Sequence, residues 1–125
     1  MSMRTPLSRV RGLGSAKEGT GHFWHQRVTG AALAILVTLF LILLIAIAGR
    51  PYPEVIAVLS NPFVALLMVL MVAAGAWHMK LGMQVVIEDY FHGGLLIAAV
   101  IANTFFSIAV GLATALALLK ISFGG

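Results

Sequence analysis

One histidine, His78, lies deep inside an apolar segment, where an ionisable side chain is costly and therefore marks a candidate functional site. Gly75 and Gly82 lie three positions before it and four after it, on the same face of a helix. An imidazole flanked by glycines has room to bind the iron of a flat macrocycle. It could instead hydrogen-bond to a polar group of a neighbouring helix. This local pattern leaves both interpretations open.

A second group of polar residues follows His78 at the end of the same segment. Glu88 and Asp89 stand where the dipole of a helix already carries partial negative charge, so they break a local preference, as functional residues often do. Asp89 follows His78 by eleven residues, close to three helical turns, so both share nearly one face. Tyr90 offers a phenolic donor at this level, or it is an aromatic residue of the membrane interface.

A basic and aromatic cluster, made of His22, Trp24, His25 and Arg27, precedes the first apolar segment. Such a cluster can anchor a helix at the interface, bind the propionates of a haem, or polarise a quinone carbonyl. Lys80 extends toward the interface or pairs with an acid or a propionate, and the sequence does not distinguish these possibilities.

The elements that position these residues are three transmembrane helices. The chain has 125 residues, of which 61% are hydrophobic and 10% charged, and a soluble domain of this size cannot bury so much apolar surface. Spans are predicted at about 28–49, 62–87 and 95–119, each long enough to cross a bilayer. Asn61 is the expected N-cap of the second span, with Pro62 as its first residue. We therefore predict an all-α integral membrane fold, an up-down bundle of three transmembrane helices over residues 28–120.

The segments between the spans are expected to be irregular. Residues 1–27 are rich in glycine and serine, and we predict an extended basic arm on a partner protein. The proline-containing stretch 50–61 is expected to be a loop, residues 88–94 a turn, and 121–125 a short tail. The apolar run of the first span is too long for a signal peptide.

The cations fix the expected orientation and exclude other partners. Five of eight precede the first span, namely Arg4, Arg9, Arg11, Lys17 and Arg27. By the positive-inside rule the N-terminus and the 88–94 turn are cytoplasmic, whereas the 50–61 loop and the C-terminus are outside. Cations placed before a span are a topology signal, so we expect membrane lipid and no nucleic acid as a partner. With no cysteine, the chain supplies no thiolate for a metal or an iron–sulfur cluster.

Small and polar residues indicate how the spans pack. Gly30 with Ala34, and the alanines of the third span, repeat at four-residue spacing, which allows helices to approach closely. Asn103 and Ser107 form a polar stripe on the third span.

Two stretches resemble a known family. The segment HFWHQRVTG (22–30) and the segment WHMKLGMQVVIEDY (77–90) are similar to the smaller of the two hydrophobic membrane anchors of succinate dehydrogenase. The spacing of His78, Gly82, Asp89 and Tyr90 is the most diagnostic element. The stretch RGLGSAKEGTGHFWHQR (11–27) resembles the alphaproteobacterial, mitochondrial-type branch.

The resemblance implies a role for each candidate residue. His78 would be one axial ligand of a haem b iron, with the second histidine supplied by the other, larger membrane anchor. Tyr90 would donate a hydrogen bond to ubiquinone, and Asp89 would shape that site or its proton supply. Arg27, with His22 or His25, would approach the haem propionates.

The resemblance further implies a complex with an iron–sulfur protein and a flavoprotein, in a bacterial inner membrane rather than a mitochondrial one. The chain would then belong to a succinate:ubiquinone oxidoreductase and would not be catalytic alone. Two alternatives remain: the anchor of a quinol:fumarate reductase, and a small structural or pore-forming membrane protein without haem.

Overall fold

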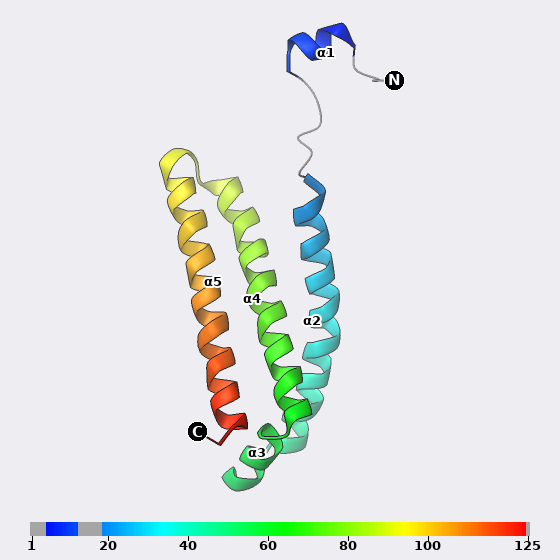
Figure 1. Ribbon diagram of the computed structural model, residues 1–125, viewed down its shortest axis with the longest axis vertical. Coiled ribbons are helices and arrows are strands. Elements are labelled where there is room, and N and C mark those ends of the chain that lie inside the picture. Colours follow the sequence, from blue (N-terminus) through cyan, green and yellow to red (C-terminus); the bar gives the residue numbers. More distant parts are fainter. Residues whose placement is uncertain (1–4, 13–18, 125) are drawn as a thin grey trace.

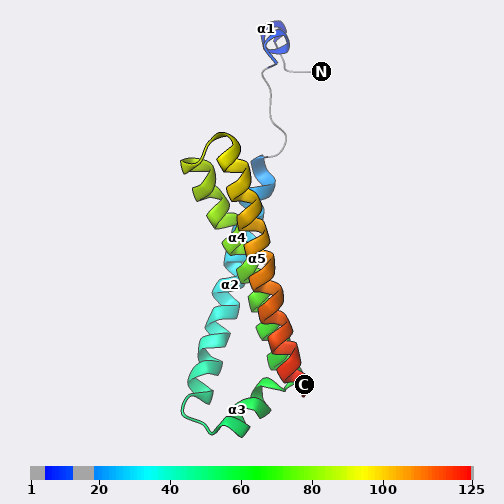
Figure 2. The same ribbon diagram turned by 90° about the vertical axis from the view of Figure 1, so that its left-hand side faces the viewer.

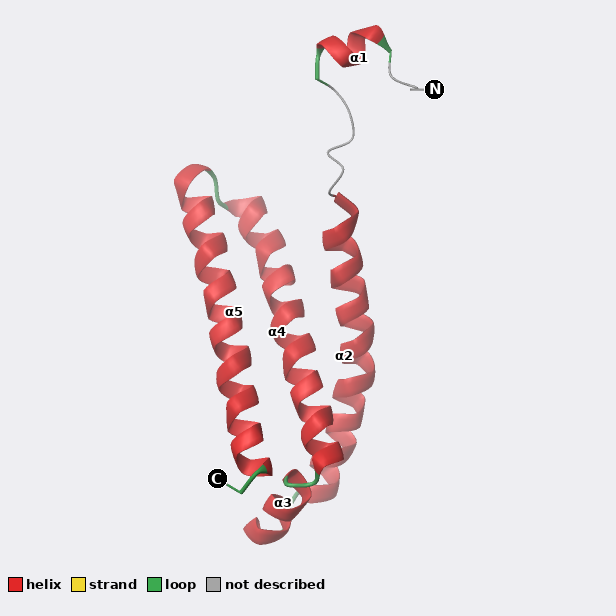
Figure 3. Cartoon of the chain, viewed as in Figure 1, coloured by secondary structure: helices red, strands yellow, loops and turns green. Residues whose placement is uncertain are grey.

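A computed structural model describes residues 5–12 and 19–124. In these ranges the chain is helical apart from short connections, as Figure 3 shows. Figure 1 labels the five helices, which are α1 (Pro6–Val10), α2 (Gly19–Ile47), α3 (Tyr52–Leu59), α4 (Pro62–Tyr90) and α5 (Gly93–Ser122).

The three long helices confirm the predicted fold class. Three helical segments, Thr20–Ile47, Pro62–Tyr90 and Gly93–Ser122, are long and apolar enough to cross a membrane. They run side by side in alternating directions, and α4 packs against both α2 and α5 (Figures 1 and 2). The start of α2, the end of α4 and the start of α5 meet at one end of the bundle, which we call the Tyr90 end (Figure 1).

The helices extend beyond the predicted spans. The first long helix begins at Gly19, so residues 19–27, expected to belong to an extended arm, form its first turns. Hydropathy locates the part of a helix that fits in lipid, whereas backbone hydrogen bonds continue through the polar residues on either side. Residues 1–4 and 13–18 of the predicted arm lie outside the described residues.

The stretch 50–61, expected to be a loop, contains the short helix α3. Its prolines do not prevent this, because Pro51 occupies the N-cap position and Pro53 lies in the first turn, where an amide hydrogen has no partner within the helix. Ser60 Oγ donates to the carbonyl oxygen of Ile121 at 3.3 Å, so this connection is attached to the end of α5.

Both ends of α4 are defined by local chemistry. The predicted N-cap is confirmed, because Asn61 Oδ1 accepts a hydrogen bond from the amide of Phe63 at 2.9 Å and Pro62 follows it. At the other end the chain turns into α5 within two residues, with Gly93 at a φ of 63°, a backbone conformation that favours glycine.

Very little of the bundle is buried within the chain. Among the described residues, only Ala65, Leu81 and Ile87 form a buried apolar core, while Asn103 and Ser107 are buried polar residues. Large apolar side chains along all three long helices are exposed. The alanines of the third span that have four-residue spacing are also exposed, so the close helix approach that their spacing favours is not made within this chain and stays a prediction. Lipid or other chains must therefore cover most of the bundle.

The orientation of the bundle stays a prediction with a direct test. Since the chain has no cysteine, single cysteines can be introduced at two exposed positions: His92, at the Tyr90 end, and Tyr52, at the opposite end (Figure 1). With the N-terminus inside, an impermeant maleimide added to intact cells should label Tyr52→Cys and not His92→Cys. Labelling of both in denatured membranes is the control, and the reverse pattern in intact cells would contradict the orientation.

Candidate functional site

His78 lies in the contact between α2 and α4. Its ring packs against Gly30, where an added Cβ would lie 3.3 Å from His78 Cε1. A side chain at position 30 would therefore press on the imidazole. Gly30 thus lies in a close helix contact, as its spacing had indicated.

A hydrogen bond with Thr29 of α2 orients the imidazole of His78. Thr29 Oγ1 lies 3.0 Å from His78 Nδ1 and 2.7 Å from the carbonyl oxygen of His25. A hydroxyl has one hydrogen to donate, and Thr29 donates it to the His25 carbonyl oxygen, its nearer partner. We infer that Nδ1 carries the ring hydrogen and donates it to Thr29 Oγ1. Nε2 then keeps the lone pair that a metal ligand needs, in the arrangement usual for a histidine oriented by a second residue.

The glycines on either side of His78, Gly75 and Gly82, lie beside side chains of α2. A Cβ at Gly75 would meet Leu33 Cδ2 at 3.8 Å, and one at Gly82 would meet Gln26 Nε2 at 3.5 Å. Both neighbours belong to α2. Both distances are those of ordinary van der Waals contacts, so a Cβ would fit at either position, and the tight approach between α2 and α4 lies at Gly30 instead.

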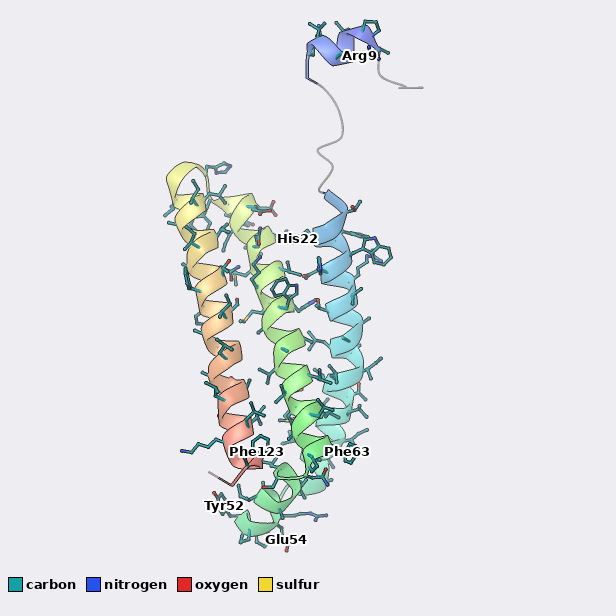
Figure 4. All side chains as sticks on the ribbon, viewed as in Figure 1. Arg9, His22, Tyr52, Glu54, Phe63 and Phe123 are labelled. Carbon is teal, nitrogen blue, oxygen red and sulfur yellow. The ribbon has the colours of Figure 1, made fainter. Side chains whose placement is uncertain are left out.

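The residues of the basic and aromatic cluster have different surroundings in the structure. His22 extends from α2 toward α4 (Figure 4), and its Nε2 is buried without a hydrogen-bond partner. His25 Nδ1 donates a hydrogen bond to the Gly21 carbonyl at 2.8 Å, and its ring meets the edge of Trp77 at a centroid distance of 6.3 Å. The guanidinium of Arg27 lies 4.4 Å from the ring centroid of Phe23 and is exposed.

Asp89 and Tyr90 occupy the last residues of α4 and are exposed, Tyr90 by 79%. Twelve residues separate Tyr90 from His78, about 18 Å at the rise of a helix. Glu88 accepts a hydrogen bond from Gln84 Nε2 at 2.7 Å. The chain therefore places the predicted quinone residues at the Tyr90 end and the predicted haem ligand well inside the bundle, as separate groups on one helix.

Sequence reasoning missed several residues of this region. Thr29 and Gln26 were not singled out, although both lie in the 22–30 segment. Gln26 and Gln84 each have a buried Oε1 without a hydrogen-bond partner. A hydroxyl and two amides close to an apolar span are the signal that would have drawn attention to them.

The opposite side of α4 carries the polar stripe of α5. Asn103 Nδ2 donates to the carbonyl oxygen of Lys80 at 2.9 Å, and Ser107 is buried nearby along the same face of α5. The ammonium group of Lys80 lies 5.6 Å from the ring centroid of Trp77. The stripe predicted on the third span is thus confirmed as a contact with α4.

No group of three or more histidine, aspartate and glutamate side chains in residues 5–12 and 19–124 is arranged to hold a metal ion. His78 offers one oriented imidazole nitrogen. A six-coordinate haem takes two axial ligands, so a second chain would have to supply the other.

Comparison with known proteins shows the family of this chain. The family described as the succinate dehydrogenase/fumarate reductase transmembrane subunit matches residues 1–118. The succinate dehydrogenase hydrophobic membrane anchor subunit of Paracoccus denitrificans is 38% identical over 120 residues, covering 96% of this chain and 93% of the relative. That of Rickettsia conorii is 35% identical over 89 residues, or 70% of each chain. The membrane anchor subunit of Reclinomonas americana is 33% identical over 84 residues, 62% of this chain and 67% of the relative.

No solved structure matches the chain. The sequence matches favour an enzyme anchor over a pore-forming or purely structural protein, and they imply other subunits of the same complex. Three spanning helices and a match that runs from residue 1 to residue 118 lead to one conclusion. The chain belongs to the succinate dehydrogenase/fumarate reductase transmembrane subunits, as a hydrophobic membrane anchor similar to those of alphaproteobacteria.

Proposed function

We propose that this anchor supplies one axial ligand, His78, to a haem b that it shares with the other membrane anchor of the complex, and that Tyr90 and Asp89 form part of a ubiquinone-reduction site. The observation that carries the proposal is the contact between Thr29 Oγ1 and His78 Nδ1 at 3.0 Å. With Nδ1 as the donor, as inferred above, Nε2 keeps its lone pair. A histidine held in this way is ready to bind a metal without reorientation.

In this proposal each side chain has a defined task. Haem b, when bound, supplies a one-electron redox centre, while the protein contributes the ligand and its orientation. His22 and His25 lie on the first turns of α2, and Arg27 follows them, so these residues are the candidates to approach the propionates. Tyr90 donates a hydrogen bond from its phenolic hydroxyl to a quinone carbonyl. The carboxylate of Asp89, the preceding residue, shapes that site or its proton supply.

Electrons from succinate would reach the quinone through the flavoprotein and the iron–sulfur protein, so this chain alone has no catalytic activity. Its setting would be a bacterial inner membrane, with the Tyr90 end facing the cytoplasm, where those soluble subunits bind. Purification of the complex in mild detergent tests this directly. Mass analysis should find three further subunits, and a reduced-minus-oxidised spectrum should show low-spin haem b. A complete complex without haem would contradict the proposal.

The hydrogen bond to Thr29 leads to a testable expectation. Thr29→Val removes the acceptor of the Nδ1 hydrogen, and loss of such an outer partner typically weakens metal binding about 10- to 100-fold. The haem content of the purified complex should fall, while the remaining haem stays low-spin because both of its ligands are still present. Haem per complex, from pyridine haemochrome and protein mass, is the measurement.

Two variants control this experiment. Thr29→Ser keeps the hydroxyl and should retain haem. Thr38→Val removes a hydroxyl of the same helix that bonds only to the carbonyl of Ala34, at 2.7 Å, and should have no effect. Equal haem content in the valine variants at positions 29 and 38 would show that Thr29 does not support the ligand.

A further inference from the structure

A groove between α4 and α5 has no function in the proposal above. Its volume is about 330 Å³, and its walls are mainly apolar, formed by Val69, Ala73 and Trp77 of α4 and by Ile108, Leu112 and Ala115 of α5. From Val69 to Lys80 it follows α4 over eleven helical steps, or roughly 16 Å. Its length and apolar lining fit the side of a helix or a hydrocarbon chain.

One end of the groove is polar. Lys80 and Ser107 both line it there, and Ser107 is only 2% exposed. The hydroxyl oxygen of Ser107 is buried without a hydrogen-bond partner, although a buried hydroxyl is normally paired. Thr104, which also lines this end, donates to the carbonyl of Val100 at 2.9 Å. The Ser107 hydroxyl and the Lys80 ammonium group would therefore both be satisfied by a polar group of an occupant at this depth of the groove.

The charge of Lys80 lies far from the end of its helix. Lys80 precedes the last residue of α4 by ten positions, about 15 Å, and its ammonium is turned toward Trp77, one turn deeper. The acidic side chains of residues 19–124 have other positions: Glu54 pairs with Arg50, Glu88 accepts from Gln84, and Asp89 stands near the end of α4. A cation at such depth is costly unless an anionic group meets it.

We propose that a transmembrane helix of another subunit of the complex occupies the α4–α5 groove and presents a carboxylate to Lys80 and a hydrogen-bonding group to Ser107. A phospholipid fits less well, because its headgroup lies at the membrane surface and its chains inside. Here the polar end of the groove lies inside the span, and the apolar walls continue from it toward the far side.

The pairing of Lys80 with a carboxylate rests on the proposed function and adds to it a second contact between subunits. Lys80 follows His78 by two residues, which turns its side chain about 200° around α4. A helix that brings a second ligand to His78 would approach another face. The groove therefore takes a separate helix, and α4 is held between elements of the complex on two sides.

A zero-length cross-link tests this pairing in the intact complex. Dicyclohexylcarbodiimide enters membranes and activates a buried carboxylate, and the Lys80 amine can then attack the activated carbonyl. An amide bond forms and dicyclohexylurea leaves. We expect mass spectrometry to find Lys80 joined to an aspartate or glutamate in a transmembrane segment of another subunit. Lys80→Arg should keep the charge pair and the full set of subunits but lose the product, because it has no primary amine.

Lys120→Arg, a change in the last turn of α5, is the matched control and should leave the product unchanged. A link from Lys80 to a haem propionate, to a lipid or to a second copy of this chain would overturn the proposal. So would the absence of any Lys80 link in a complex with all its subunits. The haem spectrum of the same sample reports on His78 independently, so failure of the cross-link and failure of the proposed function can be distinguished.

Discussion

His78→Leu is expected to remove the low-spin haem b spectrum of the purified complex, because leucine offers no lone pair to the iron and the opposite ligand alone cannot keep six-coordination. Succinate oxidation with an artificial acceptor that takes electrons from the soluble subunits should continue. Reduced-minus-oxidised spectra and subunit analysis of the same sample measure both effects.

His92→Leu is the matched control. His92 is exposed at the start of α5, and its side chain makes no capping hydrogen bond. The spectrum of this variant should equal that of the parent complex. If the complex carrying His78→Leu assembles fully and keeps an unchanged spectrum, His78 is not the ligand, and its contact with Thr29 is only a helix–helix hydrogen bond.

Tyr90→Phe should leave haem and assembly intact and remove most quinone reductase activity. The phenolic hydroxyl would donate to a carbonyl oxygen whose negative charge grows during reduction, so this hydrogen bond strengthens toward the transition state. Loss of a hydrogen bond to a developing charge costs about 1.5–3 kcal/mol, or roughly 10- to 150-fold in rate where that step is limiting. Steady-state turnover with a short-chain quinone measures the effect.

Tyr52→Phe controls for the loss of a tyrosine hydroxyl, since Tyr52 is exposed by 76%, similar to Tyr90, but lies at the opposite end of the bundle. Its activity should be unchanged. The artificial-acceptor assay should be equal in both variants, because it draws electrons before they reach the anchor. If Tyr90→Phe turns over quinone as fast as Tyr52→Phe, then Tyr90 is an aromatic residue of the membrane interface and not a quinone ligand.

The sequence determined the architecture of this protein, because membrane spans depend on local composition. A run of apolar residues long enough to cross lipid must be helical, since no water is present to satisfy the backbone. The cap at Asn61 was predictable for the same reason, as it depends on two adjacent residues. The exact helix ends were not, because the polar residues after Gly19 give no hydropathy signal and because the prolines that begin helix α3 suggested a loop.

The family was also readable from the sequence, since its diagnostic residues lie within two short segments, 22–30 and 77–90. The order of His78, Gly82, Asp89 and Tyr90 along one helix sets their depths by the helical rise alone. What each residue contacts did not follow from these segments.

Only the tertiary structure decided which residues meet. Thr29 and His78 are 49 positions apart, and Asn103 reaches Lys80 across 23. Each contact depends on how α2 and α5 are rotated and shifted against α4. That packing follows from side-chain shape at close range, such as the fit of the His78 ring against Gly30, and not from hydropathy. The glycines beside His78 suggested space for a ligand from sequence alone, and in the folded chain a Cβ at either position would make only an ordinary contact with a side chain of α2.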